Sequence, residues 1–287
     1  MVHTVAASMS WWQATILGIV EGLTEYLPVS STGHLLLAQR AMGMAQTQEA
    51  KEAADAYAIV IQAGAILAVA GLYWKRFVQM AKGLMGKDQA GLRLALNVGL
   101  AFAITGAIGL PSEHFVKTYL FDSIPAINAA WLAGGLAILA VVYFKPKKRG
   151  GFPPGGVDSL TLPQAAIIGL MQVLAMWPGT SRSLITIVAG LLVGLSVSAA
   201  VEFSFILGVV TLLGATAVEL HKHHQTLTAN YGVFDMLLGF VVAGGFAAIA
   251  VEWMVTYLKR HSLSLFGWYR VILAAVVGAL MVMGKLG

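Results

Sequence analysis

Reactive side chains are concentrated between residues 21 and 34, inside an otherwise apolar segment. They are Glu21, Glu25, Ser30, Ser31, Thr32 and His34. Carboxylates at membrane depth are unfavourable unless they face a polar cavity, and ionisable residues in such segments usually have a function. The stretch therefore indicates chemistry carried out within the boundaries of a lipid bilayer.

Glu21 and Glu25 are four residues apart and share one face of a helix. Two carboxylates in this arrangement can hold a divalent cation, or act as an acid and a base. The alternative is a structural role in ion pairs, but the desolvation of carboxylates in an apolar segment favours function. We expect both residues to be catalytic, and they are the candidate metal ligands.

Ser31 and His34 are three residues apart. In a helix that begins near Ser30 they lie on one face of its first turn. A hydroxyl within reach of an imidazole is typical of an activated nucleophile. The structural alternative is that Ser30, Ser31 and Thr32 only cap the helix. Capping does not exclude function, because a helix N-terminus also offers free N–H groups to an anion.

A second stretch, residues 169–183, repeats the pattern of the first. With one gap, Gly18 aligns with Gly169, Glu21 with Gln172, Tyr26 with Trp177, Pro28 with Pro178, and Ser31 with Ser181. Arg182 follows in this stretch, and a buried arginine requires an anionic partner. Its planar guanidinium suits a phosphate. An ion pair with Glu21 or Glu25 is the structural alternative, and the two readings can coexist in a resting site.

The composition is that of a polytopic membrane protein. Of the 287 residues, 58% are hydrophobic and 11% are charged, whereas soluble domains carry about 25% charged residues. The net charge of +5 is modest and its cations lie in loops, so no nucleic-acid partner is expected. The chain has no cysteine, which excludes disulfides and thiolate chemistry. Residues 1–9 lack Lys and Arg, so we expect no cleaved signal peptide.

Six apolar stretches are long enough to cross a bilayer as helices. They are residues 54–74, 93–110, 124–144, 197–220, 232–258 and 266–285. Residues 11–42 and 161–194 are also apolar, but each is interrupted by a proline followed by small hydroxyl residues. Each is expected to form a helix, a break and a second helix. Irregular backbone at membrane depth is tolerated where it lines a cavity.

Clusters of Lys and Arg at residues 75–93, 145–149 and 259–260 orient the chain, because positively charged loops stay in the cytoplasm. The count of spans between these clusters fits if each broken segment enters and leaves on one side. The two broken segments then approach the midplane from opposite faces, as in transporters with inverted repeats. By the same count, the histidine-rich residues 221–224 are expected in a solvated outer loop.

We therefore predict one all-α polytopic membrane domain over residues 1–287, with six transmembrane helices and two re-entrant helix hairpins in inverted-topology repeats. Repeat one covers about 10–144, a cytoplasmic linker covers 145–160, and repeat two covers about 161–287. Small and hydroxyl residues at the breaks are predicted to bind a phosphate. They are Ser30, Thr32, Gly33, Thr180, Ser181, Ser183 and Thr186.

At these positions the chain resembles the undecaprenyl-diphosphate phosphatase family, also called BacA or UppP. Residues 21–25 and 27–34 are similar to the first signature of that family, and residues 178–183 are similar to the second. Residues 61–64, 202–205 and 214–217 extend the resemblance over most of the chain. Residues 1–9 and 221–229 match nothing in the family pattern, and Thr180 stands where a bulkier residue is common.

The resemblance implies hydrolysis of undecaprenyl diphosphate to undecaprenyl phosphate and phosphate. This reaction recycles the lipid carrier of peptidoglycan synthesis and confers resistance to bacitracin. It also implies a multi-pass protein of the bacterial inner membrane, a site open to the periplasmic or outer side, and a divalent cation such as Mg²⁺. The expected partners are the polyprenyl diphosphate and the lipid bilayer, with a homodimer as the candidate assembly.

The expected mechanism is attack by Ser31 on the terminal phosphate, with His34 as base or as acid for the leaving group. Arg182 would clamp the phosphate, while Glu21 and Glu25 hold a cation or a proton. His34 as the direct nucleophile is the alternative mechanism. The alternative function is an inverted-repeat carrier or flippase for polyprenyl phosphate, which needs the same anion site but no nucleophile and base.

Overall fold

The computed structural model describes residues 9–44, 47–120, 123–144 and 156–286 of the chain. These residues form helices joined by short connections, without a strand among them. Six helices are long and apolar enough to cross a membrane. They are α3 (Gln48–Leu72), α5 (Gln89–Tyr119), α6 (Ile124–Phe144), α9 (Val197–Asn230), α10 (Val233–Leu258) and α11 (Ser264–Val282). The predicted all-α, multi-pass fold is confirmed.

The two interrupted segments form helix–break–helix pairs, as the prolines predict. The first pair is α1 (Trp11–Thr24) and α2 (Ser31–Ala41). The second is α7 (Leu162–Gln172), extended by the 3-10 turn η2 (Val173–Met176), and α8 (Arg182–Leu192). Within each pair the two helices pack against each other. Their re-entrant placement in a bilayer stays a prediction.

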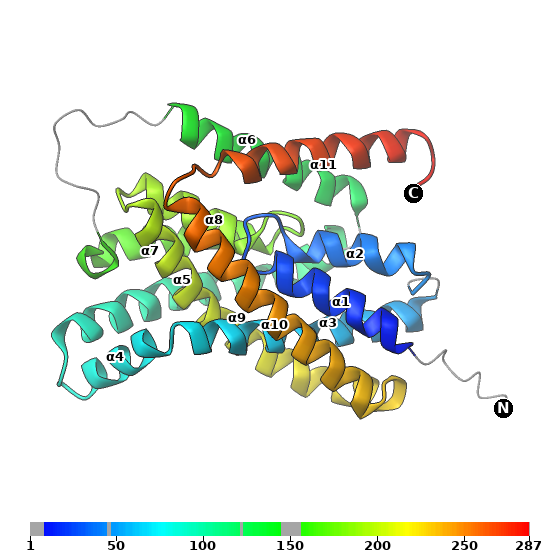
Figure 1. The fold of residues 1–287 in the computed structure, drawn as a ribbon, viewed down its shortest axis with the longest axis horizontal. Helices are drawn as coiled ribbons and strands as arrows, with labels where there is room; N and C mark the ends of the chain where they lie inside the picture. Colours follow the sequence, from blue (N-terminus) through cyan, green and yellow to red (C-terminus); the bar gives the residue numbers. More distant parts are fainter. Residues whose placement is uncertain (1–8, 45–46, 121–122, 145–155, 287) are drawn as a thin grey trace.

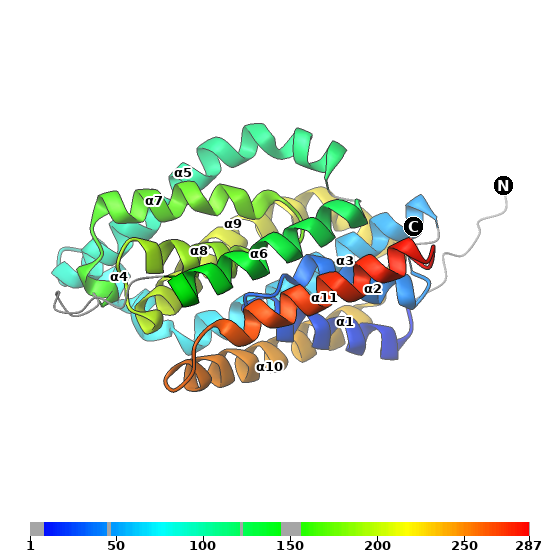
Figure 2. The ribbon, with the colours of Figure 1, turned by 90° about the horizontal axis from the view of Figure 1, so that it is seen from above.

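The two pairs pack against the long helices, with α1 on α10, α7 on α5 and α8 on α9 (Figure 1). Helix α10 crosses the molecule diagonally and packs on both α1 and α3, while α3 also packs on α9. Helices α6 and α11 lie side by side, as Figures 1 and 2 both show. Every residue of α8 from 183 to 191 is buried, so the second pair contributes to the core. Helix α2 is less enclosed and borders a cavity.

Two helices extend beyond their expected ends, and one additional helix is present. Helix α9 continues to Asn230, so residues 221–224 are helical and do not form the expected outer loop. Glu219 pairs with Lys222 at 2.9 Å and with His223 at 3.3 Å, and such contacts one turn apart stabilise a polar helix end. Helix α5 continues through Pro111 to Tyr119, and the basic segment after α3 contains α4 (Trp74–Leu84).

The described end of the predicted linker is packed against the bundle. Residues 145–155 lie outside the described residues, but Val157 and Leu160 are buried around the 3-10 turn η1 (Val157–Ser159). Arg76 of α4 pairs with Asp158 at 3.1 Å and with Glu202 of α9 at 2.7 Å. These contacts gather α4, η1 and the start of α9 at one end of the bundle.

Candidate active site

Each break ends in a serine held in an unusual backbone conformation. Ser30 is the N-cap of α2 and Ser181 is the N-cap of α8, and φ is 75° at both. A left-handed conformation is unfavourable by about 1–2 kcal/mol for a residue with a Cβ. Such strain is concentrated at functional sites in proteins. The shared geometry makes Ser30 the structural equivalent of Ser181, which corrects the sequence alignment by one residue.

This correction pairs Ser31 with Arg182, because each is the first residue of its helix. Both contact Glu25, which lies at the C-terminal end of α1. The Ser31 hydroxyl donates a hydrogen bond to Oε2 of Glu25. Nη2 of Arg182 lies 3.4 Å from Oε1 of the same carboxylate, with side chains 10% and 6% exposed. The structure thus connects a hydroxyl, a carboxylate and a guanidinium across the two breaks.

Arg182 is held from several sides. Its Nη1 donates to the carbonyl oxygen of Ser204 at 3.0 Å, and its Cζ lies 5.1 Å from the centre of the Tyr26 ring. A Cβ at Gly208 would lie 2.0 Å from Nη1, so the glycine provides the space for the guanidinium. The Nε donor is buried and has no hydrogen-bond partner among the described residues. One donor of the guanidinium therefore remains for a ligand.

His34 does not form the hydrogen bond to Ser31 that the spacing suggested. Its Nδ1 lies 2.6 Å from the carbonyl oxygen of Ser30, and its Nε2 lies 2.7 Å from the hydroxyl of Tyr269. The ring stacks on Tyr269 and meets Trp131 edge-on. Ser31 instead turns back to the end of α1, where Glu25 provides a stronger acceptor. The expected Ser31–His34 pair is wrong for this structure because both side chains have other partners.

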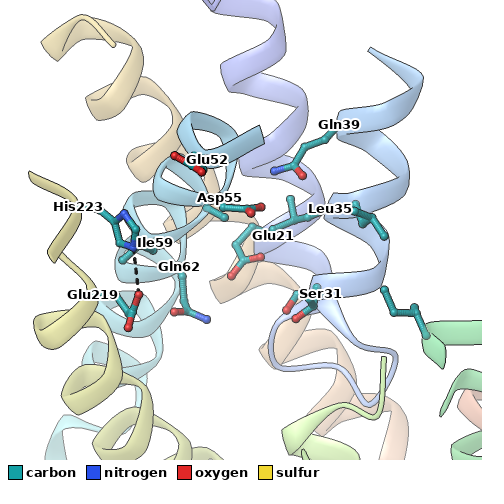
Figure 3. Close-up of a pocket in the computed structure, with 14 residues that line it drawn as sticks. Glu21, Ser31, Leu35, Gln39, Glu52, Asp55, Ile59, Gln62, Glu219 and His223 are labelled. Carbon is teal, nitrogen blue, oxygen red and sulfur yellow. Dashed lines mark ion pairs between the residues drawn. The ribbon is translucent and has the colours of Figure 1, made fainter. Parts of the chain in front are cut away.

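A cavity of about 520 Å³ opens beside the first break (Figure 3). Among the predicted residues, Glu21, Ser31 and Thr32 line it. Figure 3 shows Glu21 between Asp55 of α3 and Ser31 of α2. Glu21 is 1% exposed, and its Oε2 has no hydrogen-bond partner among the described residues. Glu25 contacts Ser31 and Arg182, and neither Glu25 nor Arg182 is among the residues that line the cavity.

Several of the residues predicted to bind phosphate have structural partners. Ser183 donates to the carbonyl oxygen of Leu27 at 2.9 Å and lies 3.0 Å from the hydroxyl of Ser181. These bonds connect the second break to the first. The Ser181 hydroxyl also accepts from the N–H of Leu184, as a helix cap does.

Other predicted positions differ in their exposure to a ligand. Thr186 is fully buried, with its hydroxyl 2.6 Å from that of Ser204, so it does not face the cavity. Gly33 packs against Trp131, where a Cβ would lie 2.2 Å from Cζ2. The N–H of Thr180 donates to the carbonyl oxygen of Trp177 at 3.1 Å, and Thr32 is exposed at the cavity. Thr32 therefore has the more direct access to a phosphate.

Of the two predicted metal ligands, Glu21 and Glu25, only Glu21 is placed to hold a cation. Within the described ranges, no group of three or more His, Asp or Glu side chains is arranged to hold a metal ion. Glu25 uses its two oxygens for Ser31 and Arg182, whereas Glu21 has a free oxygen at the cavity. Mg²⁺ is commonly held by one or two carboxylates together with substrate phosphates. Glu21 fits that mode, and Glu25 does not fit it in this arrangement.

One buried cation beside the breaks was missed by the sequence analysis. Arg270 lies inside α11 and is fully buried, with donors directed at both breaks. The signal was present in the sequence, because an arginine inside an apolar span is a candidate functional residue by the same rule that selected Glu21. Tyr269 beside it, the partner of His34, gave no comparable signal.

Comparisons with known proteins agree with the motif resemblance. Residues 14–276 match the family described as "Bacitracin resistance protein BacA". The chain is 40% identical over 270 residues to "Undecaprenyl-diphosphatase" of Sorangium cellulosum, which covers 94% of this chain and 86% of that protein. It is 39% identical over 265 residues to "Undecaprenyl-diphosphatase 2" of Rhodospirillum rubrum, covering 92% and 93%. It is also 37% identical over 265 residues to "Undecaprenyl-diphosphatase" of Acinetobacter baumannii.

Proposed function

This chain belongs to the bacitracin resistance protein BacA family, and we propose that it hydrolyses undecaprenyl diphosphate to undecaprenyl phosphate and phosphate. Relatives that cover more than nine-tenths of the chain are named for this activity. Hydrolysis recycles the lipid carrier of cell-wall synthesis. It also removes the diphosphate that bacitracin sequesters, which accounts for resistance to that antibiotic.

The observation that carries the proposal is the contact of Ser31 and Arg182 with one carboxylate, Glu25. Phosphoryl transfer needs an oriented nucleophile and neutralisation of charge on the transferred group. A hydroxyl that donates to a buried carboxylate is an oriented nucleophile. The N-termini of α2 and α8 add free N–H groups beside it, which favour an anion.

Ser31 attacks the terminal phosphorus of the substrate, and Glu25 accepts the hydroxyl proton. The anhydride bond breaks, undecaprenyl phosphate leaves with the electron pair and the proton from Glu25, and a phosphoserine remains. Water then attacks the phosphoserine while Glu25 accepts a proton from it. The same proton returns to Oγ of Ser31 as phosphate leaves, which restores the starting site.

Arg182 contributes to this mechanism, and His34 to its alternative. Nε of Arg182 has no described partner and is available to a phosphate oxygen as charge develops there. In neutral His34, Nδ1 donates to the Ser30 carbonyl, because that oxygen can only accept. Nε2 then accepts from the Tyr269 hydroxyl, and it is the atom that would form a phosphohistidine in the alternative mechanism.

The proposal includes a divalent cation and a defined membrane side. Glu21 would hold the cation together with substrate oxygens, where it would neutralise diphosphate charge. The cavity lies where α3 begins and α9 ends, since Asp55 and Glu219 line it. That end is opposite to Arg76 of α4 and to Lys259 at the end of α10, which supports an outer or periplasmic opening in the bacterial inner membrane. A homodimer is the assembly we propose there.

Phosphate release from pure undecaprenyl diphosphate tests the function. Detergent-solubilised protein should release phosphate, and a Ser31→Ala preparation with the same unfolding temperature should release none above background. Rapid acid quenching of the wild type during turnover should trap a phosphoserine at position 31. Absence of hydrolysis, with movement of polyprenyl phosphate across reconstituted vesicles, would support the carrier instead. A trapped phosphohistidine at position 34 would replace Ser31 as nucleophile.

A further inference from the structure

Arg270 forms hydrogen bonds with main-chain carbonyl groups from three parts of the fold. Its Nη2 donates at 2.8 Å to Gly179 and at 2.8 Å to Ala130. Its Nε donates to Trp131 at 3.2 Å, and its Nη1 makes a longer contact of 3.5 Å with Pro28. The side chain is fully buried. All four acceptors are uncharged, and no carboxylate of the described residues pairs with it.

Two of these acceptors belong to the two breaks. Pro28 lies two residues before Ser30, and Gly179 lies two residues before Ser181. Ser30 and Ser181 are the strained N-caps of α2 and α8. Arg270 therefore bridges the backbones that lead into both strained turns. A guanidinium suits this position because its five donors point in fixed, different directions.

The neighbouring backbone is shaped to accommodate the guanidinium. A Cβ at Gly134 of α6 would lie 2.5 Å from Nη2 and 2.9 Å from Cζ of Arg270. A Cβ at Gly135 would lie 3.1 Å from its Cβ. Alanine at position 134 or 135 would displace the Arg270 side chain. The two glycines therefore leave the space through which Arg270 reaches the breaks.

Stability alone is a poor reason for this arrangement. A buried cation without an ionic partner loses its hydration and gains only carbonyl dipoles in return. Apolar side chains would join α6 and α11 without that penalty. Intramembrane charges that persist in spite of it usually serve a function.

We propose that Arg270 is a positioning residue of the phosphatase reaction. It holds the two breaks at a fixed separation, so that Ser31 and Arg182, the first residues of α2 and α8, act on the same phosphate. Ser183 and Leu27 form a second connection between the breaks, on the side of Ser181. The inference rests on the proposed function and adds to it a residue that does not itself touch the substrate.

A purely structural role predicts a different outcome. If Arg270 only joins α6 to α11, any disturbance of that interface should act alike. Gly267 provides the matched control, because it packs α11 on α6 one turn before Arg270. A Cβ there would lie 2.8 Å from Leu139, and none of its near neighbours is Arg270 or a break.

The experiment compares Arg270→Lys, Gly134→Ala and Gly267→Ala with the wild type. Unfolding temperature, kcat and KM for undecaprenyl diphosphate are measured on the same preparations. Lysine cannot reach carbonyls of both breaks at once, and alanine at position 134 displaces the guanidinium. For both we expect kcat to fall about 10- to 100-fold with KM changed much less, because misplacement of reacting groups acts on the transition state. Gly267→Ala should keep kcat near that of the wild type, whatever its unfolding temperature.

Two results would overturn the inference. One is a folded Arg270→Lys protein with wild-type kcat. The other is a loss of kcat in Gly267→Ala equal to that in Gly134→Ala, which would assign the effect to the interface as a whole. If Arg270→Lys does not fold, the comparison of the two glycine variants decides. A wild type that releases no phosphate refutes the proposed function, and the positioning role with it.

Discussion

Replacement of Glu25 by glutamine separates the chemistry of the site from its electrostatics. In Glu25→Gln the amide oxygen can still accept from Ser31, but it no longer takes up the proton. Loss of a general base lowers turnover by about 10²- to 10⁴-fold, so kcat should fall within that range. Removal of one partner of a buried ion pair lowers stability by about 3–5 kcal/mol. The contact to Arg182 is long, at 3.4 Å, so we expect the lower end of that range.

The assay measures phosphate release and unfolding on three preparations. They are Glu25→Gln, the double variant Glu25→Gln with Arg182→Gln, and Glu21→Gln. The double variant removes both charges of the pair and should regain much of the lost stability. It should remain inactive, because the base and the phosphate clamp are both absent. Glu21→Gln is a control for the unfolding measurement only: it removes a buried carboxylate that is hydrogen-bonded to neither Ser31 nor Arg182, whereas its activity should fall because Glu21 is the proposed cation ligand.

Two results would refute this reasoning. A Glu25→Gln protein within about 10-fold of wild-type kcat would exclude Glu25 as the base, since that is below the range for such catalysis. Recovery of activity in the double variant would show that the carboxylate and guanidinium only balance each other. In that case Ser31 would need another base, and His34 would become the leading nucleophile.

Three further predictions follow from the geometry. Tyr269→Phe removes the hydrogen bond to His34 and should lower kcat about 5-fold, as the loss of about 1 kcal/mol implies; a fall beyond 100-fold would mean that the hydroxyl takes part in catalysis. Ser30→Val should be less stable to unfolding than Ser30→Gly by at least about 1 kcal/mol, because valine cannot relax at positive φ; equal stability in the two variants would show that the turn is not strained. A single cysteine at Gln225 should react with membrane-impermeant maleimide on intact cells, and one at Ser262 only after permeabilisation; the opposite pattern would reverse the orientation.

The spans could be predicted because length and hydropathy decide them. Hydropathy does not predict helices at the edges of the bundle that are stabilised by polar contacts. The end of α9 stays helical through the pairs of Glu219 with Lys222 and His223, and these side chains look like a loop in a hydropathy profile. Helix α4 is similarly amphipathic and carries Arg76, whose ionic partners Asp158 and Glu202 are distant in the sequence.

The residue types of the site were predictable, but their pairing was not. Intramembrane carboxylates and a proline-interrupted helix select Glu25 and Ser31 from sequence alone. Their contact depends on where α1 ends and in which direction the first side chain of α2 points, which three-residue spacing does not specify. The same spacing made His34 look like the partner of Ser31. Arg270 could have been selected by its type, whereas its contacts with both breaks depend on tertiary packing.

The position of Arg270 on α11, near the end of the sequence, has a consequence for the order in which the site is synthesised. A ribosome synthesises both hairpins, with Ser31 and Arg182, before it reaches residue 270. Until α11 has inserted beside α6, the two hairpins lack the guanidinium that bridges them. Under the proposed mechanism, Ser31 of a nascent chain is therefore synthesised before the site that orients it is assembled. If Arg270 positions the two breaks as proposed, chains truncated before α11 should enter the membrane without hydrolytic activity.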